Sequence, residues 1–322
     1  MAGTGAIDVH AHHLPGALLD ALRRREEPPC VRAGGEPDLL DCGGGLAYPL
    51  IPPLLDLGVG AAQRAELEID LQLLSAPPPG VAGLPRAEAA AIARAANDEL
   101  AAAGAGTRAL AVLPLEHPDD AVAELERAAA AGHVGGQLLS NAGGEPLEVE
   151  SHQELFEAAA RLDLPLVIHP TLPIDRGAVA AHGLMTTLGF VFDTSACAAR
   201  LVLGGLFERW PGLKLLLPHA GATLTPLLAR FDYELDLMAL APLSTPPSEQ
   251  LRLLYLDSIC DSPAALCLAL EEFGTDRVLY GSDEPFWGAE RGLAVVDEAL
   301  AGDTEGLGSV RRGNAERLFR LD

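Results

Sequence analysis

Short apolar segments alternate with longer amphipathic segments along almost the whole chain. Eight of the apolar segments predict strands, at residues 6–12, 69–75, 109–115, 134–140, 165–170, 214–221, 253–259 and 277–285. Each segment is mainly apolar throughout and does not alternate between apolar and polar residues. This pattern is typical of parallel strands that are buried on both faces.

The intervals between these segments have helical spacing. We predict helices near residues 86–103, 118–131, 151–162, 195–210, 225–239, 262–273, 291–300 and 304–319. Eight strands alternating with helices predict an α/β fold, a (β/α)8 TIM barrel, in a single domain over residues 1–322. A doubly wound open sheet is the structural alternative. No GxGxxG follows the first strand, which removes the usual dinucleotide-binding version of that sheet.

Residues 13–66 interrupt the alternation directly after the first predicted strand. This stretch is rich in proline and glycine, with Pro28-Pro29, Gly43-Gly44-Gly45 and Pro52-Pro53. Long insertions in compact domains are usually lids, binding loops or disordered segments. Because the insertion follows the end of a barrel strand, we predict that residues 13–66 form a lid over the active site.

Composition and charge narrow the range of partners. The chain has 322 residues and a net charge of −24, which repels phosphate. We therefore expect neither nucleic acid nor an anionic membrane as a partner. We also expect no signal peptide and no transmembrane helix, because the start lacks a basic and then apolar region and no apolar run approaches 18 residues. The five cysteines are odd in number and form no CxxC pair, which predicts reduced thiols and a cytoplasmic location.

The basic residues include a single lysine, Lys214. This leaves one candidate for a Schiff base, for a phosphate-binding lysine or for a carbamylated bridge between two metal ions. The position of Lys214 at the start of the sixth predicted strand places it at the closed end of a barrel.

Histidines and an aspartate follow several of the predicted strands. The first strand ends in Asp8-Val9-His10-Ala11-His12, and residues two apart on a strand point to the same side. His169, His219 and Asp283 come at the ends of the fifth, sixth and eighth strands. In a barrel these ends meet at the mouth, where active sites lie. Imidazole and carboxylate are ligands of Zn²⁺, so the pattern predicts a metal site.

Six segments in this order resemble a known family. They are residues 7–15 (IDVHAHHLP), 166–170 (LVIHP), 204–211 (GGLFERWP), 218–221 (PHAG), 281–286 (GSDEPF) and 313–319 (GNAERLF). The sequence is similar to the amidohydrolase superfamily, in the branch of 2-amino-3-carboxymuconate-6-semialdehyde decarboxylase and related metal-dependent decarboxylases. The resemblance covers nearly the whole chain and is more specific for the branch than for the substrate.

The resemblance implies roles for the residues that match the motifs. The ligands of one divalent metal ion, usually zinc, would be His10, His12, His169 and Asp283. His219 would lie near the metal-bound water and move protons, a role that Asp283 shares. Two-metal relatives use a carbamylated lysine on the fourth strand. The fourth strand here has Gln137 and no lysine, which predicts a mononuclear site. Because the single lysine, Lys214, is expected at the closed end of the barrel, Schiff-base chemistry is excluded as well.

The substrate residues depart from the family pattern. In the best-known decarboxylase of the branch, an arginine after the first strand holds a substrate carboxylate, and Ala47 or Tyr48 falls at that place here. A pocket with Leu46, Tyr48, Leu50 and Phe286 would suit an apolar or aromatic substrate, on which Trp287 would stack. Arg230 matches an arginine that reaches into the neighbouring subunit's site, which implies a homodimer.

The other polar residues near strand ends receive weaker interpretations. Asp257 ends the seventh strand and would support a ligand histidine or the substrate, with a structural role as the alternative. His182 follows the fifth strand, and a substrate contact is one hypothesis for it. We expect His117, His133 and His152 to be surface residues.

The first functional hypothesis is a zinc-dependent decarboxylase of a small unsaturated or aromatic carboxylic acid, using a metal-bound water and a histidine acid/base. The second is a metal-dependent hydrolase of an amide, ester, lactone or C–C bond. The third is a hydratase with a similar site. A catalytically silent metal-binding or scaffold protein belongs to a different class, and the complete ligand set argues against it.

Overall fold

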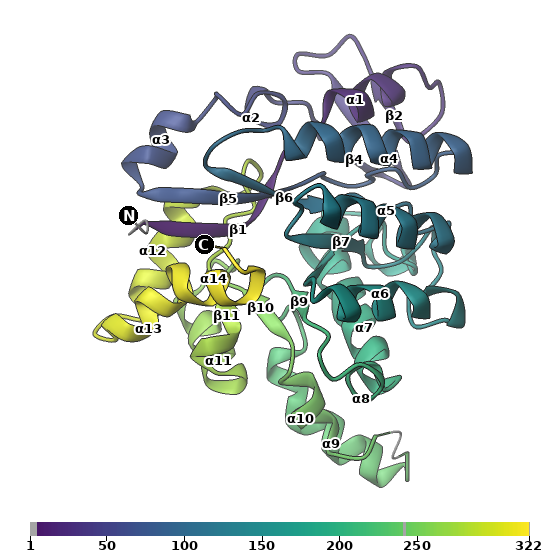
Figure 1. The fold of residues 1–322 in the computed structure, drawn as a ribbon. Coiled ribbons are helices and arrows are strands. Elements are labelled where there is room, and N and C mark those ends of the chain that lie inside the picture. The colour runs from purple at the N-terminus through teal and green to yellow at the C-terminus, as the bar shows by residue number, and fades with distance from the viewer. Residues whose placement is uncertain (1–4, 241–242, 322) are drawn as a thin grey trace.

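The computed structural model describes residues 5–240 and 243–321. Eight parallel strands form one sheet, and its order follows the chain (Figure 1). The strands are β1 (Ala6–His12), β5 (Ile69–Ser75), β6 (Thr107–Ala111), β7 (Gly135–Leu139), β8 (Leu166–His169), β9 (Leu215–Leu217), β10 (Tyr255–Asp257) and β11 (Val278–Leu279). Every strand pair in this sheet is parallel, as expected where helices cross between successive strands.

The first and last strands meet and close the sheet. The backbone N–H of Val9 donates to the carbonyl of Tyr280 at 2.9 Å, and that of His12 donates to the carbonyl of Glu284 at 2.7 Å. In the other direction, the N–H of Asp283 donates to the carbonyl of His10 at 2.8 Å. The predicted (β/α)8 barrel is confirmed, and the open doubly wound sheet is wrong.

Helices pack around the outside of the barrel. The longer ones are α4 (Arg86–Ala101), α5 (Pro118–Ala130), α6 (Gln153–Leu162), α7 (Phe190–Leu203), α9 (Leu228–Leu237), α11 (Pro263–Phe273) and α12 (Ala289–Ala299). The helix predicted at residues 195–210 is divided into α7 and α8 (Leu206–Arg209), because Gly205 has a φ of 83°. The helix predicted at 304–319 is likewise divided, into α13 (Thr304–Gly308), a π-helical turn (Ser309–Gly313) and α14 (Asn314–Phe319).

The inside of the barrel is a packed core and not a channel. It contains side chains from strands all round the sheet, namely Ile7, Val9, Leu73, Leu110, Val167, Leu216 and Leu279. Leu318 and Phe319 of α14 join the same cluster. Lys214 precedes β9 and pairs with Asp163, which follows α6, at an N–O distance of 2.8 Å. The only lysine is therefore used at the closed end of the barrel, away from the strand ends that carry the histidines.

The insertion after β1 is folded. It comprises α1 (Gly16–Arg23), an antiparallel sheet of β2 (Cys30–Arg32), β3 (Leu39–Gly43) and β4 (Leu46–Pro49), and two short helices, α2 (Pro52–Leu55) and α3 (Ala61–Glu66). Gly43, Gly44 and Gly45 all have positive φ and turn the chain from β3 to β4. Leu18, Leu40 and Leu54 are fully buried and pack in one cluster with the alanine face of α4. The opening and closing of a lid stays a prediction.

One helical stretch, Met185–Leu203, has the length and mean hydropathy that a membrane span requires. Length and composition are the only grounds for that description. In this fold 44% of the stretch is buried, and α7 packs on β8 and β9. A core helix of a globular domain has the same properties.

Candidate metal centre

Four buried side chains converge at the mouth of the barrel. His10 and His12 come from β1, His169 ends β8, and Asp283 lies in the turn after β11. Their ligand atoms all lie within 4.8 Å of one another. The Nε2 atom of His12 is 3.2 Å from Nε2 of His169 and 3.0 Å from an oxygen of Asp283. The structure brings together the four residues that sequence analysis proposed as ligands.

These distances fit a divalent metal ion. Zn–N bonds of about 2.0–2.1 Å in a tetrahedral site place two ligand atoms ~3.3 Å apart. The Nε2 atom of His10 is 3.7 Å from Asp283 and is buried with no hydrogen-bond partner in the described part of the chain. Gln137 lies on β7, the fourth strand of the barrel, where a bridging lysine would be needed for a second ion. The cluster supports a single divalent metal site.

The protonation states of the cluster also suit a metal. Burial lowers the pKa of His12, and burial together with the neighbouring histidines holds the pKa of His169 well below its usual value. Both imidazoles are therefore neutral and have a lone pair to donate. Burial alone would raise the pKa of Asp283, but its contact with His12 and the nearby His10 lower it below the ordinary carboxyl value. Asp283 is thus an anionic ligand.

Asp257, at the end of β10, positions two histidines at once. One carboxylate oxygen is 2.8 Å from Nδ1 of His10, and the other accepts the backbone N–H of His219 at 2.7 Å. Burial alone would lower the pKa of His10, but the Asp257 hydrogen bond and Asp283 raise it to about 8. The carboxylate keeps a proton on Nδ1, so Nε2 is the nitrogen that would ligate an ion, after it has released its own proton. Of its two proposed roles, the support of a ligand histidine is the one that this geometry favours.

Asp8 has a similar supporting position that sequence analysis missed. It is fully buried and accepts hydrogen bonds from the N–H and the hydroxyl of Ser282 at 3.0 and 2.7 Å. The side-chain amide of Gln72 donates to it at 3.0 Å. Burial raises the pKa of Asp8 to about 6. Because Ser282 precedes Asp283, Asp8 joins β1 to the turn that carries the carboxylate ligand. The sequence shows only that Asp8 is two residues before His10 on the same strand, and its partners Gln72 and Ser282 lie far away in the chain.

His219 stands beside the cluster in a strained turn. Its φ is 60°, and Ala220, Gly221 and Ala222 also have positive φ, which is uncommon outside glycine and typical of functional sites. Its ring centroid is 6.0 Å from that of His10, and its Nδ1 is buried without a hydrogen-bond partner in the described residues. Burial lowers its pKa. A neutral imidazole at this place can accept a proton.

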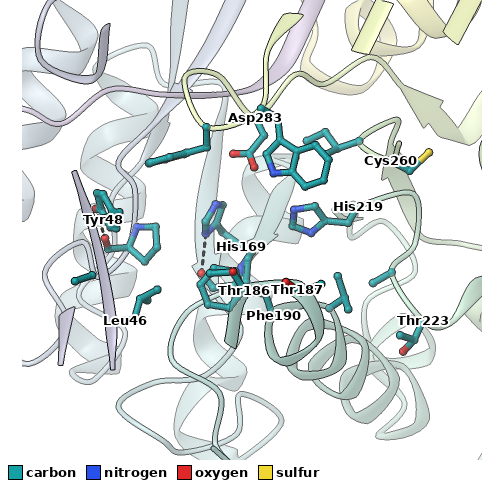
Figure 2. Close-up of a pocket in the computed structure, with 18 residues that line it drawn as sticks. Leu46, Tyr48, His169, Thr186, Thr187, Phe190, His219, Thr223, Cys260 and Asp283 are labelled. Carbon is teal, nitrogen blue, oxygen red and sulfur yellow. Dashed lines mark hydrogen bonds between the residues drawn. The ribbon is translucent and has the colours of Figure 1, made fainter. Parts of the chain in front are cut away.

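A cavity of about 580 Å³ opens beside these residues (Figure 2). Tyr48 of β4 forms one wall, and its ring lies edge-on to Phe286 with the centroids 5.3 Å apart. The Tyr48 hydroxyl donates to the carbonyl of Pro78, which fixes the ring. Trp287 also lines the cavity. The proposed substrate residues Tyr48, Phe286 and Trp287 thus face the cavity, whereas Leu50 does not, because it packs in the core beneath the insertion.

Arg230 lies away from this cavity. It is on α9, 69% exposed, and pairs with Glu234 at 3.0 Å. Within one chain it does not line the cavity, so its proposed role in a neighbouring subunit stays a prediction. His182 is exposed and does not line the cavity either.

Two histidines expected on the surface are buried, which corrects the prediction. His152 has 2% exposure and is 3.0 Å from the carbonyl of Leu115, and His133 has 4% exposure and is 3.2 Å from the carbonyl of Ala128. Each ring has one nitrogen within hydrogen-bond distance of a backbone carbonyl, in the last turn of α5 for His133 and in the turn before α5 for His152. His117 is half-buried.

A barrel with this four-residue cluster at its mouth defines a metal-dependent barrel enzyme. The amidohydrolase family model matches residues 7–321, and the chain belongs to this family. The expected family is confirmed.

Relatives with stated activities were found by sequence and by structure. The chain is 30% identical to the gamma-resorcylate decarboxylase of Rhodococcus jostii over 80% of this chain and 85% of that protein. It is similar to 5-carboxyvanillate decarboxylase from Sphingomonas paucimobilis with a TM-score of 0.87 and 26% identity, over 99% of this chain and all of that one. A dihydroxybenzoic acid decarboxylase from Polaromonas sp., with bound manganese and the inhibitor 2-nitroresorcinol, gives a TM-score of 0.82 and 25% identity, over 99% and 97% of the two chains.

Proposed function

We propose that this chain is a metal-dependent decarboxylase of an aromatic carboxylic acid. The observation that carries the proposal is an aromatic-walled cavity lined at one end by His219 and by two of the four proposed ligands, His169 and Asp283. A flat ring fits between such walls while its carboxylate reaches the polar end. The activities named for the similar proteins support the same conclusion.

The residues divide the chemistry between them. A divalent ion, held by His10, His12, His169 and Asp283, would supply Lewis-acid stabilisation of negative charge on substrate oxygens. Decarboxylation breaks the bond between the ring and CO2, and the ring carbon must then receive a proton. His219 faces this end of the cavity, and its neutral imidazole would first take up a proton from water and then pass that proton to the ring carbon, with Asp283 next to it. Phe286 and Tyr48 hold the ring and keep water from its faces.

The identity of the ion is proposed as Zn²⁺. Three imidazoles and one carboxylate form a nitrogen-rich set that Zn²⁺ accepts readily. The manganese bound to the Polaromonas relative makes Mn²⁺ the alternative to be tested. Metal analysis after loading with each ion separates the two.

We further propose a cytoplasmic homodimer in which Arg230 reaches the partner's site. Arg230 shares α9 with apolar side chains that are exposed in the single chain, Tyr233 at 67% and Leu237 at 66%. An apolar helix face beside an arginine is typical of an interface between subunits. A single domain with residues 13–66 as a lid also remains our proposal, supported by the β4 side chains in the cavity wall.

The decisive experiment measures CO2 release from 2-hydroxybenzoic acids by the Zn²⁺-loaded and the Mn²⁺-loaded protein. We expect release that requires the metal and is lost in His219→Ala. Methyl esters and amides of the same acids test the hydrolase alternative. Hydrolysis of these compounds without CO2 release from any acid would refute the decarboxylase proposal.

A further inference from the structure

The turn that carries His219 has a backbone conformation that needs support from outside the turn. Its four residues, His219, Ala220, Gly221 and Ala222, have φ values of 60°, 51°, 80° and 51°. This region is unfavourable for residues with a Cβ atom, so three of the four oppose the conformation. Such strain persists only where the surrounding structure over-determines it. The N–H of Ala222 donates to the carbonyl of His219 at 2.8 Å, which closes the turn but does not fix where it lies.

Side chains from two neighbouring elements hold the two ends of this turn. At its start, Asp257 at the end of β10 accepts the N–H of His219 at 2.7 Å. At its end, Ser195 of α7 accepts two hydrogen bonds from Thr223, the residue that follows the turn. The backbone N–H of Thr223 donates to Oγ of Ser195 at 2.9 Å, and the Thr223 hydroxyl donates to the same atom at 2.7 Å. The start is therefore fixed from the metal side and the end from the helix.

The hydroxyl of Ser195 is fully used by contacts within the chain. It is buried, with 4% exposure, and donates its own proton to the carbonyl of Val191 at 2.6 Å. A hydroxyl has one donor and two acceptor positions, so these three hydrogen bonds occupy all of them. Val191, Thr223 and His219 line the cavity, and Figure 2 shows Thr223 and His219 on the same side of it. Ser195 thus joins two walls of the cavity from behind.

Resting on the proposed function, we propose that Ser195 is a positioning residue for the proton transfer by His219. It does not touch the reacting atoms. By anchoring Thr223 on α7, it fixes the end of the turn and with it the place and direction of the His219 imidazole. Without this anchor the strained turn relaxes and carries the imidazole away from the ring carbon that must receive the proton. A misplacement of about 1 Å caused by a remote substitution can lower a rate by about 100-fold.

Ser195→Ala removes the anchor, and Thr194→Val is the matched control. Thr194 is the preceding residue of α7 and is also buried, but its hydroxyl donates only to carbonyls of its own helix, those of Phe190 and Val191. For CO2 release by Ser195→Ala, we expect kcat to fall about 10- to 100-fold, with KM within threefold and the metal content unchanged. The solvent deuterium isotope effect on kcat should rise, because proton delivery becomes rate-limiting. In Thr194→Val, kcat should stay within twofold. An unchanged kcat in Ser195→Ala, or an equal loss in both variants, would overturn the proposal.

A double-mutant cycle tests the contact between the two hydroxyl groups. Thr223→Val removes the donated hydroxyl and keeps the backbone N–H that bonds Ser195. In the double variant, the loss in kcat should be smaller than the product of the two single losses, because both substitutions break the same contact. Losses that multiply fully would show that Ser195 and Thr223 act independently, which contradicts an anchor.

A readout besides activity keeps this proposal separate from the decarboxylase proposal. Zn²⁺-loaded protein labelled with ¹³C at histidine Cε1 gives an NMR signal for each imidazole, and His219→Ala assigns that of His219. Ser195→Ala should shift or split this signal, whereas Thr194→Val should leave it in place. An unchanged His219 signal in Ser195→Ala would refute the positioning role. The expected shift, without CO2 release from any acid by the unsubstituted protein, would refute the activity and leave the anchoring of the turn supported.

Discussion

Replacing Asp257 by asparagine should weaken metal binding far more than it weakens the fold. The Oδ1 atom of Asp257 accepts the backbone N–H groups of His219 and Ile259, and an amide oxygen can still do so. The Oδ2 atom faces Nδ1 of His10, where the variant would place an NH2 group. Two donors would then oppose each other, so His10 would carry its proton on Nε2. That nitrogen is the one directed at the other ligands.

The size of the effect follows from the supporting role of the carboxylate. Removing the hydrogen-bond partner of a ligand histidine typically lowers metal affinity by about 10- to 100-fold, or ~1.4–2.7 kcal/mol. We expect a loss in this range for Asp257→Asn. The free energy of unfolding of the metal-free protein should change by less than about 1 kcal/mol, because the amide keeps the backbone hydrogen bonds.

Competition with a chelating dye measures the affinity, and denaturant unfolding measures the stability. Asp41→Asn is the control, because Asp41 is also buried, pairs with Arg32 and lies in β3 of the insertion. A dissociation constant for Asp257→Asn within twofold of the unsubstituted protein would refute the reasoning. An equal loss in Asp41→Asn would also refute it, since the effect would then be general.

Three further predictions concern proton transfer by His219, the number of metal ions per chain and the buried carboxylate of Asp8. His219→Ala should retain the metal and lose about 10²- to 10⁴-fold in turnover; retained turnover would refute the acid/base role. Metal analysis should give one ion per chain, unchanged in Lys214→Met, because Lys214 pairs with Asp163 at the closed end of the barrel; two ions per chain would contradict the mononuclear site. Asp8→Ala should lower the free energy of unfolding by about 3 kcal/mol, measured in urea, since it leaves the buried N–H and hydroxyl of Ser282 without an acceptor and removes one of the two acceptors of the Gln72 amide; a loss below 1 kcal/mol would contradict that account.

The barrel and its metal cluster could be predicted because buried parallel strands leave a clear apolar signal. The bounds of β1 and β5 match the prediction residue for residue. The ligand types follow the strands directly, so the topology brings them together at one mouth. The strand predicted at 109–115 is instead Thr107–Ala111. Asn97 of α4 bonds both backbone groups of Val112 and replaces the neighbouring strand there, which an apolar pattern does not reveal.

The insertion shows where a single sequence is least informative. The three glycines at the end of β3 and after it are a hairpin signal, but the flanking strands are short and β4 ends at Pro49, so the region was predicted as a lid without elements. The buried histidines His133 and His152 were missed because their partners are backbone carbonyls. Asp8 was missed because its role depends on Gln72 and Ser282, which are distant in sequence.

The closure of the barrel between β1 and the turn after β11 has a consequence for assembly. The ligands His10 and Asp283 stand on opposite sides of this junction, so nearly the whole chain separates them. A bound ion would therefore act as a cross-link between the beginning and the end of the fold. Because the loop that it closes is long, the cross-link would restrict the conformational entropy of the chain strongly. A nascent chain must reach Asp283 before it can hold the ion. Metal retention would then report that the last barrel strand has docked on the first.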